Sequence, residues 1–258
     1  MLYIITKMLE NPINNNELIT LIIPTINRLT LIDTLESLEN QTNPDWKAIC
    51  VFDNVTPDDN IKLKLDSDPR FKYIILSKKL GQNRNFAGLV RNVGIRQANT
   101  EWIGFVDDDD TLTPYYVQRL KEELIVNSDV ECIIFRMICE KKIQNVELVE
   151  MSEAFQDKNR SQKEIPFSST DYDIIPPSNA TTIRKGRVGI SFCYKLKLFY
   201  ENLNFFPSSI EDFLLLKQIK LNKKKILISP YVTYQIKLNK ISLDIDQIEQ
   251  KNSRIIIN

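Results

Sequence analysis

The chain of 258 residues contains no histidine. This absence excludes the serine and cysteine hydrolase triads that use an imidazole base, and every zinc site that requires a histidine ligand. A metal ion bound here would therefore sit on oxygen ligands. The formal net charge is zero, with 34 basic and 34 acidic residues, so nucleic acid is not an expected partner.

Cysteines are few and dispersed. None of them forms a C-x-x-C pair, and they lie far apart or inside apolar runs. We therefore expect reduced core residues at Cys50, Cys132, Cys139 and Cys193.

Long apolar runs are absent as well. No stretch reaches 18 apolar residues, the length at which a membrane-spanning helix is considered. The N-terminal sequence MLYIITKMLENPINNN has a short apolar patch, but Lys7 and Glu10 interrupt it, unlike the apolar region of a secretory signal. The sequence therefore predicts a soluble cytoplasmic protein without a transmembrane segment.

From Glu17 onward, apolar runs alternate with amphipathic stretches. The runs LITLIIP, WKAICVFD, KYIILS and WIGFV predict buried strands, and helices are expected between them, including one from about Asn85 to Ala98. Short apolar strands separated by helices are typical of an α/β fold with a mostly parallel sheet covered on both faces.

The pattern is less regular in the second half of the chain. TPYYVQRLKEELIVN predicts a helix and VECIIFRMIC a strand, whereas residues 141–182 show no clear period. SIEDFLLLKQIKL then predicts an amphipathic helix opened by Ser208 or Ser209. No internal repeat is present, and the last 20 residues carry no clear signal.

Polar clusters follow the first, second and fourth predicted strands, at PTINR, FDN and DDDD. Ligands of parallel α/β sheets bind beyond the carboxyl ends of the strands, so these clusters are expected to converge on one edge. Two carboxylates about 5 Å apart at an effective dielectric near 20 repel by roughly 3 kcal/mol. The cluster from Asp107 to Asp110 is therefore either a solvated acidic turn or a cation site.

The acidic cluster has the composition of a site for a hard cation. Mg²⁺ is commonly held by one or two carboxylates plus substrate phosphates. Asp107 and Asp109 follow a buried strand with D-x-D spacing, which favours metal binding over a solvated turn. Asp53 and Arg91 are less specific candidates, because a strand-end aspartate commonly forms a turn and a helical arginine is commonly solvated.

The chain resembles the family 2 glycosyltransferases of the GT-A fold in five segments, which are PTINR, TLESLENQT, VFDN, RNVGIRQANTEWIGFVDDDDTLTP and IEDFLLLKQI. The resemblance spans residues 18–125 and, more loosely, 186–219. It implies one GT-A domain over residues 1–258, with a Rossmann-like central sheet and a smaller C-terminal portion. The nucleotide-sugar-binding half would be 17–125, the acceptor-side half 126–239 and the tail 240–258.

The resemblance also implies an activity. This is the metal-dependent, inverting transfer of one sugar from a nucleotide-diphosphate sugar, with a UDP-sugar as the expected donor, to a hydroxyl of a glycan, glycoconjugate or protein acceptor. Asp109, with Asp107, would hold Mn²⁺ or Mg²⁺. Asp212 would be the catalytic base, with Glu211 beside it, although acidic pairs are also common in a first helical turn. Donor contacts are implied for Thr25, Asn27, Asp53, Arg91, Asp107 and Asp108.

Some segments depart from the family pattern or leave two interpretations open. Arg184, Lys185 and Arg187 of IRKGRVG would either meet the diphosphate or form a solvated loop. Ile26 stands where the family often has an aromatic residue or histidine, and Asn54 replaces a common second aspartate. No Q-x-x-R-W-like motif follows the late acidic pair, which favours single-sugar transfer over processive synthesis.

Two rival functions remain. A catalytically silent domain that binds nucleotide sugar or a partner would keep the same fold, although the acids at 107, 109 and 212 are intact. A sugar nucleotidyltransferase should open with a glycine-rich basic loop, and IPTINRLT contains no glycine. The sequence sets no oligomeric state.

Overall fold

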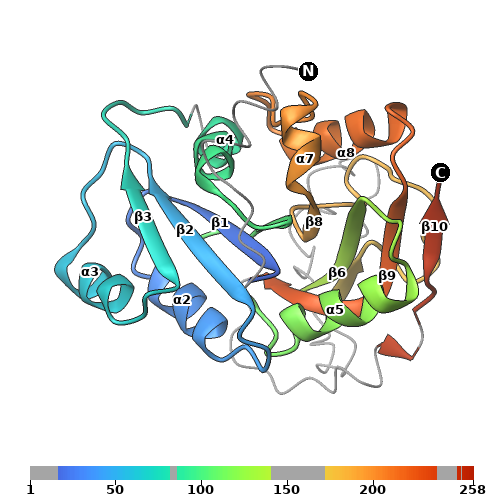
Figure 1. The fold of residues 1–258 in the computed structure, drawn as a ribbon, viewed down its shortest axis with the longest axis horizontal. Helices are drawn as coiled ribbons and strands as arrows, with labels where there is room; N and C mark the ends of the chain where they lie inside the picture. The colour runs from blue at the N-terminus through green and yellow to red at the C-terminus, as the bar shows by residue number, and fades with distance from the viewer. Residues whose placement is uncertain (1–16, 82–85, 141–171, 237–248, 251) are drawn as a thin grey trace, which may run out of the picture.

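A ten-stranded sheet with flanking helices forms the centre of the molecule (Figure 1). The computed structural model describes residues 17–81, 86–140, 172–236, 249–250 and 252–258. In chain order the elements are β1 (Ile19–Thr25), α2 (Leu31–Glu39), β2 (Trp46–Phe52), α3 (Asp59–Asp66), β3 (Phe71–Ile75), α4 (Gly88–Gln97), β4 (Trp102–Phe105), β5 (Asp110–Leu112), α5 (Tyr116–Val126), β6 (Cys132–Glu140), β7 (Tyr172–Ile175), β8 (Phe192–Lys195), α7 (Leu196–Tyr200), α8 (Glu211–Leu221), β9 (Ile226–Ile236) and β10 (Ile255–Ile257). The N-terminal segment 1–16 and most of the irregular segment 141–182 lie outside the described residues.

Four strands from the first half of the chain pair in parallel, in the order β3-β2-β1-β4. In β1, Ile19 lies opposite both Trp46 of β2 and Trp102 of β4. Because these pairs are parallel, the loops after β1, β2 and β4 leave at the same edge. Figure 1 shows α2 and α3 along one side of these strands and α4 on the other. The predicted α/β fold with a mostly parallel central sheet is confirmed.

The second half of the chain extends the sheet with antiparallel pairs that the sequence did not predict. β8 is antiparallel to both β4 and β6, whereas β9 is parallel to β6 and carries β10 on its other edge. β5, inside the acidic cluster, pairs with β9 from Asp110 opposite Ile236. This pairing brings the end of β9 to the acidic cluster.

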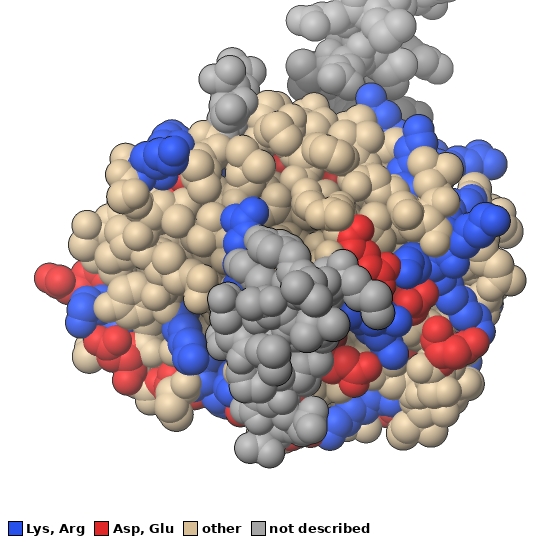
Figure 2. Space-filling model, turned by 45° about the horizontal axis from the view of Figure 1, so that its top comes forward, with Lys and Arg blue, Asp and Glu red and all other residues tan. Residues whose placement is uncertain are grey.

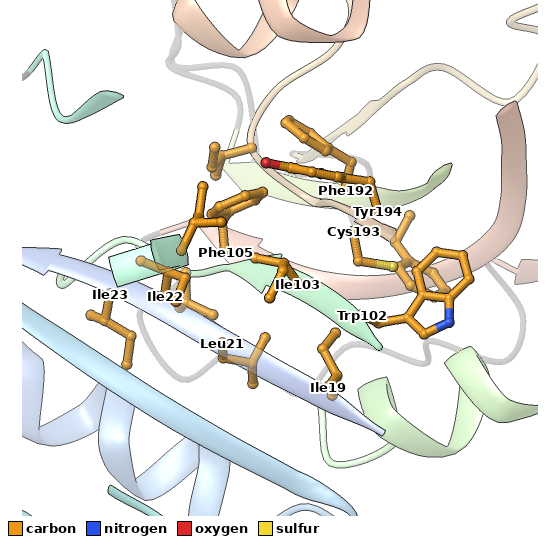
Figure 3. Close-up of a cluster of buried hydrophobic side chains, with 14 of the residues drawn as sticks. Ile19, Leu21, Ile22, Ile23, Trp102, Ile103, Phe105, Phe192, Cys193 and Tyr194 are labelled. Carbon is orange, nitrogen blue, oxygen red and sulfur yellow. The ribbon is translucent and has the colours of Figure 1, made fainter. Parts of the chain in front are cut away.

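Apolar side chains of both halves of the sheet share one core (Figure 3). Phe105 of β4 packs against Phe192 and Tyr194 of β8, with ring centroids 5.3 and 5.9 Å apart. Complete burial of a side chain as large as phenylalanine stabilises a fold by about 1.5–3 kcal/mol, so this contact joins the two halves. All four cysteines are free; Cys139 is partly exposed, and burial raises the pKa of all four thiols.

Helix starts differ from the sequence prediction. The expected first residue of α4, Asn85, lies outside the described residues, and the helix spans Gly88–Gln97. The prediction that Ser208 or Ser209 opens α8 is wrong, because Ile210 is the N-cap. The Ser208 hydroxyl instead accepts a hydrogen bond from the Ile210 N–H at 3.3 Å, which holds a turn before the helix. No helix in the described ranges is both long and apolar enough to cross a membrane.

Candidate active site

A cavity of about 1030 Å³ lies at the carboxyl edge of the parallel strands. Its wall comes from the segments at and after the ends of β1, β2, β3 and β4, from the starts of α4 and α8, and from residues 189–190, with Met137 of β6 and Ile236 of β9. The structure brings most of the predicted site residues to this wall: Thr25, Asp53, Arg91, Asp107, Asp108, Asp109, Glu211 and Asp212. Asn27 is not among the lining residues.

Asp108 is the buried centre of the acidic cluster, with 4% of its surface exposed. Its carboxylate accepts hydrogen bonds from the Thr25 hydroxyl at 2.7 Å and from the Ile26 N–H at 3.3 Å. Burial raises the pKa of Asp108, and the hydrogen bond from Thr25 opposes that rise. The cluster is thus fastened to the end of β1, so it is not a freely solvated turn.

The other acids of the cluster also have partners. Arg28 donates to Asp108 and Asp109 at 3.0 Å each, and Arg91 pairs with Asp107. The Tyr234 hydroxyl of β9 accepts from the Asp107 N–H at 3.1 Å and donates to Asp110 at 2.9 Å. Each carboxylate therefore has a cation or a hydroxyl beside it, which offsets the mutual repulsion that the sequence implies.

Asp107 and Asp109 supply the oxygen donors that a metal ion would need. Within the described part of the chain, no group of three or more acidic, histidine or cysteine side chains is placed to hold a metal by itself. Mg²⁺ requires only one or two carboxylates when substrate phosphates complete its coordination. The donor set therefore fits a hard cation that binds together with a diphosphate.

The ends of β1 and β2 form a second wall, on the side where a nucleoside is predicted. Asp53 accepts hydrogen bonds from the Leu80 N–H at 2.6 Å and the Gly81 N–H at 2.9 Å. Asn27 donates its N–H to the Thr25 hydroxyl at 2.9 Å, and its side-chain oxygen accepts from the Asp58 N–H. Asp53 thus organises a loop while it lines the cavity, and Asn27 supports Thr25 from outside it.

Glu211 and Asp212 lie in the first turn of α8 but differ in environment. Glu211 is 8% exposed, accepts a hydrogen bond from the Gly88 N–H at 2.8 Å and pairs with Arg91. The Asp212 carboxylate accepts a hydrogen bond from the N–H of the next residue, Phe213, at 2.7 Å. Burial raises the pKa of both carboxyls. Asp212 is the one without a paired arginine among the described residues.

The basic segment Arg184–Arg187 forms an exposed turn. The Arg187 N–H donates to the Arg184 carbonyl at 3.0 Å, and Gly186 has a φ of 72°, which suits glycine. None of the three cations lines the cavity, so their contact with a diphosphate stays a prediction. Figure 2 shows basic and acidic side chains interspersed on one face of the molecule, in keeping with the zero net charge.

Sequence reasoning missed three residues of the site. Arg28 stands in the PTINR segment, but a single arginine after a strand gives no specific signal. Tyr234 lies 127 positions from Asp107 on a strand whose pairing could not be foreseen. Gly189 lies beside Asp212, because a Cβ there would be 3.7 Å from the Asp212 Oδ2.

Comparisons with known proteins agree on one family. Residues 20–185 match the model of glycosyl transferase family 2. Over 98 residues the chain is 34% identical to the GalNAc(5)-diNAcBac-PP-undecaprenol beta-1,3-glucosyltransferase of Campylobacter jejuni, covering 36% of this chain and 30% of that one. Over 125 residues it is 31% identical to the uncharacterized glycosyltransferase YwdF of Bacillus subtilis, covering 45% and 43%. The match thus spans less than half the length of either relative.

Solved structures share the fold at low sequence identity. TarS 1–349 of S. aureus in complex with UDP-GlcNAc has a TM-score of 0.60 and 18% identity, over 87% of this chain and 60% of that chain. The mannosyltransferase PcManGT of Pyrobaculum calidifontis, in complex with GDP-Man and Mn²⁺, has a TM-score of 0.55 and 15% identity, over 96% and 67%. At these identities the likeness establishes the fold.

Proposed function

Because the chain belongs to glycosyl transferase family 2, whose model matches residues 20–185, we propose that it transfers one sugar from a nucleotide-diphosphate sugar to a hydroxyl of a glycan, glycoconjugate or protein. One observation carries the proposal: a single cavity joins the acidic cluster to Asp212. A donor at the acids and an acceptor at Asp212 would meet there. We include a UDP-sugar donor, Mn²⁺ or Mg²⁺ and inversion at the sugar in the proposal.

The nucleoside would lie along the ends of β1 and β2. Asp53 lines the cavity, and each of its oxygens, already bonded to one backbone N–H, keeps a second lone pair for a nucleoside donor. Thr25 lies beside it, with its hydroxyl held by Asp108 and Asn27. The structures of TarS with UDP-GlcNAc and PcManGT with GDP-Man support a nucleotide-sugar ligand in this fold.

The diphosphate would lie over the acidic cluster. Bound Mn²⁺ or Mg²⁺ supplies charge neutralisation of the leaving diphosphate. Asp107 and Asp109 would hold the cation, while Arg28, paired with Asp108 and Asp109, reduces the negative potential that the diphosphate meets.

The acceptor would lie beside Asp212, which would take the proton of the attacking hydroxyl. Attack from the face opposite the leaving diphosphate inverts the sugar. Glu211 suits this role less well, because Arg91 and the Gly88 N–H already occupy its oxygens. The residues assigned to the donor all precede residue 125, whereas Asp212 follows it. We therefore include in the proposal a donor half at 17–125 and an acceptor half at 126–239.

Gly81→Ala is expected to weaken UDP binding by roughly tenfold, the scale of one hydrogen bond to a charged group. A Cβ at this position would lie 2.6 Å from the Asp53 Oδ2, so the carboxylate must move. Calorimetry with UDP and Mn²⁺ measures the effect. Leu63→Ala is the control, because Leu63 is an exposed residue of α3 that does not line the cavity. Unchanged affinity in Gly81→Ala would remove Asp53 from the nucleoside site.

Removal of the metal is expected to weaken binding of UDP-GlcNAc or GDP-mannose by roughly tenfold or more. Two like charges about 5 Å apart repel by roughly 3 kcal/mol at an effective dielectric near 20, so the acids oppose a diphosphate that arrives without a cation. The measurement is calorimetry with Mn²⁺ and then with EDTA. Equal affinity in both conditions would contradict the metal assignment, and no binding of either donor would count against a transferase using these sugars.

A further inference from the structure

The first turns of α4 and α8 pack directly on each other. A Cβ at Gly88 would lie 2.7 Å from the Glu211 Oε2 and 3.0 Å from the Phe206 carbonyl oxygen, so no larger residue fits without movement. The Gly88 N–H donates to the same Glu211 oxygen. One turn of α4 further on, the Asn92 side chain donates to the Phe205 carbonyl at 2.9 Å and accepts from the Phe205 N–H at 3.1 Å. α4 therefore fixes the segment that leads into α8.

Arg91 lies between these contacts, on the same face of α4. Its side chain is buried, with 4% of the residue exposed, and its two terminal nitrogens pair with different elements. One nitrogen pairs with Glu211 of α8, and the other pairs with Asp107 of the acidic cluster. The Phe205 ring lies 5.5 Å from the guanidinium carbon, and the Nε has no hydrogen-bond partner among the residues that the structure describes. The hydrogen bonds that the guanidinium makes to described residues are thus both to carboxylates, one on α8 and one in the acidic cluster.

We propose that Arg91 is a positioning residue that links the donor side of the site to the helix carrying Asp212. The expected effect of Arg91 on catalysis rests on the proposed function. The pairing of Arg91 with Asp107 and Glu211 does not depend on that function. Arg91 holds Asp107, on which the donor's cation would bind, and it holds Glu211, the residue before Asp212 in the chain. These two ion pairs fix the position of the first turn of α8 relative to the acidic cluster.

The arrangement in which Arg91 pairs with both Asp107 and Glu211, called the Arg91 bridge below, affects stability differently from a single ion pair. A buried cation is strongly destabilising when it loses its counter-ion, and much less so while one carboxylate remains. Asp107→Asn or Glu211→Gln alone leaves Arg91 with one carboxylate, whereas the double variant leaves it with none. The double substitution should therefore reduce the folding equilibrium constant about threefold or more beyond the product of the single effects.

Denaturant unfolding of the free protein tests the bridge without any ligand. The cycle of Asp107→Asn and Glu211→Gln is measured in the wild-type chain and again in Arg91→Met. With Arg91 present, we expect the double variant to lose more stability than the two single variants predict together. In Arg91→Met, where the two carboxylates have no cation between them, we expect this extra loss to disappear or to reverse. Additive effects in both backgrounds would overturn the proposal.

The catalytic consequence is tested with Arg91→Lys, which keeps the charge but cannot reach both carboxylates with a planar fork. Turnover of UDP-GlcNAc or GDP-mannose with Mn²⁺ should fall roughly tenfold or more, with donor affinity within about threefold. Arg136→Lys is the matched control, because Arg136 is also fully buried but donates to the backbone carbonyls of Pro176, Pro177 and Ser253. We expect that control to lose stability and to keep its turnover number.

The outcomes separate the proposal from the function it rests on. A loss of donor affinity in Arg91→Lys as large as the loss of turnover would make Arg91 a donor-binding residue and overturn the positioning role. An equal loss of turnover in Arg136→Lys would also overturn the positioning role, because the loss would then follow from the substitution of any buried arginine. If wild-type protein turns over neither donor, the proposed function fails, and the unfolding cycle alone decides whether the bridge exists.

Discussion

Asp212→Asn is expected to lower sugar transfer by about a hundredfold or more while leaving donor affinity within a few fold. The size of the effect is typical of the loss of a positioned general base. Asp212 lies on the cavity wall and has no arginine partner among the described residues. Gly189 lies beside it, since a Cβ at that position would be 3.7 Å from the Asp212 Oδ2. The measurement is transfer rate and donor affinity of the same preparation, because a base acts on the acceptor and not on donor binding.

Glu211→Gln is the comparison that separates the two acids. It should slow transfer less than Asp212→Asn, and it should lower stability more, because Arg91 loses one of its two carboxylates. A larger loss of transfer in Glu211→Gln would reverse the two roles. If neither variant slows transfer, another residue is the base, and Glu211 and Asp212 have only a structural role in the first turn of α8.

The pH dependence of transfer follows from the environment of Asp212. Burial raises the pKa of this carboxyl from its ordinary value of 3.8. A base must be ionised, so transfer should fall as the pH decreases through this raised pKa, at a higher pH than for a solvated aspartate. A raised pKa in the folded state also means that the ionised carboxylate costs stability above that pKa. Asp212→Asn should therefore be at least as stable as the wild type at neutral pH.

Asp109→Asn is expected to abolish metal-dependent donor binding and to leave the fold intact. Asp109 is paired with Arg28 at the cavity wall, and Arg28 keeps its contact with Asp108 when the charge at 109 is removed. Far-UV circular dichroism should be unchanged, while calorimetry with UDP-GlcNAc and Mn²⁺ should show no more affinity than with EDTA.

The control for this variant is Asp59→Asn, which removes an exposed acid from the first turn of α3. It takes away the same charge at a position that does not line the cavity, and donor affinity should not change. If Asp109→Asn binds and turns over the donor like the wild type, Asp109 is not a metal ligand and the interpretation of the D-x-D spacing is wrong.

The sequence predicted the part of the site that depends on local pattern. Asp53 and Asp107 each follow a short apolar strand, and parallel strands place their carboxyl ends at one edge, so their shared cavity could be foreseen. The contacts that hold the acids could not, because they join distant positions. Arg28 lies 80 positions from Asp108, and Arg91 lies 120 positions from Glu211.

The start of α8 was mispredicted for a related reason. Serines at 208 and 209 have the chemistry of a helix cap, and a local rule places the start there. In the structure the Gly88 N–H and Arg91 bind Glu211, so tertiary contacts with α4 decide where the first turn lies. The antiparallel pairing of β8 with β4 was not predicted either, because an apolar run in the sequence does not indicate the direction of the strand beside it.

The contact of Tyr234 with both Asp107 and Asp110 limits how far the chain can be divided. The segment matched by the family model ends at residue 185, yet the hydroxyl that contacts the acidic cluster comes from β9, and Glu211 and Asp212, which line the same cavity, come from α8. β8, which covers the apolar edge of β4, also follows the matched segment. The matched segment is therefore not an autonomous unit, because its acidic cluster takes its final geometry from residues that follow it in the chain.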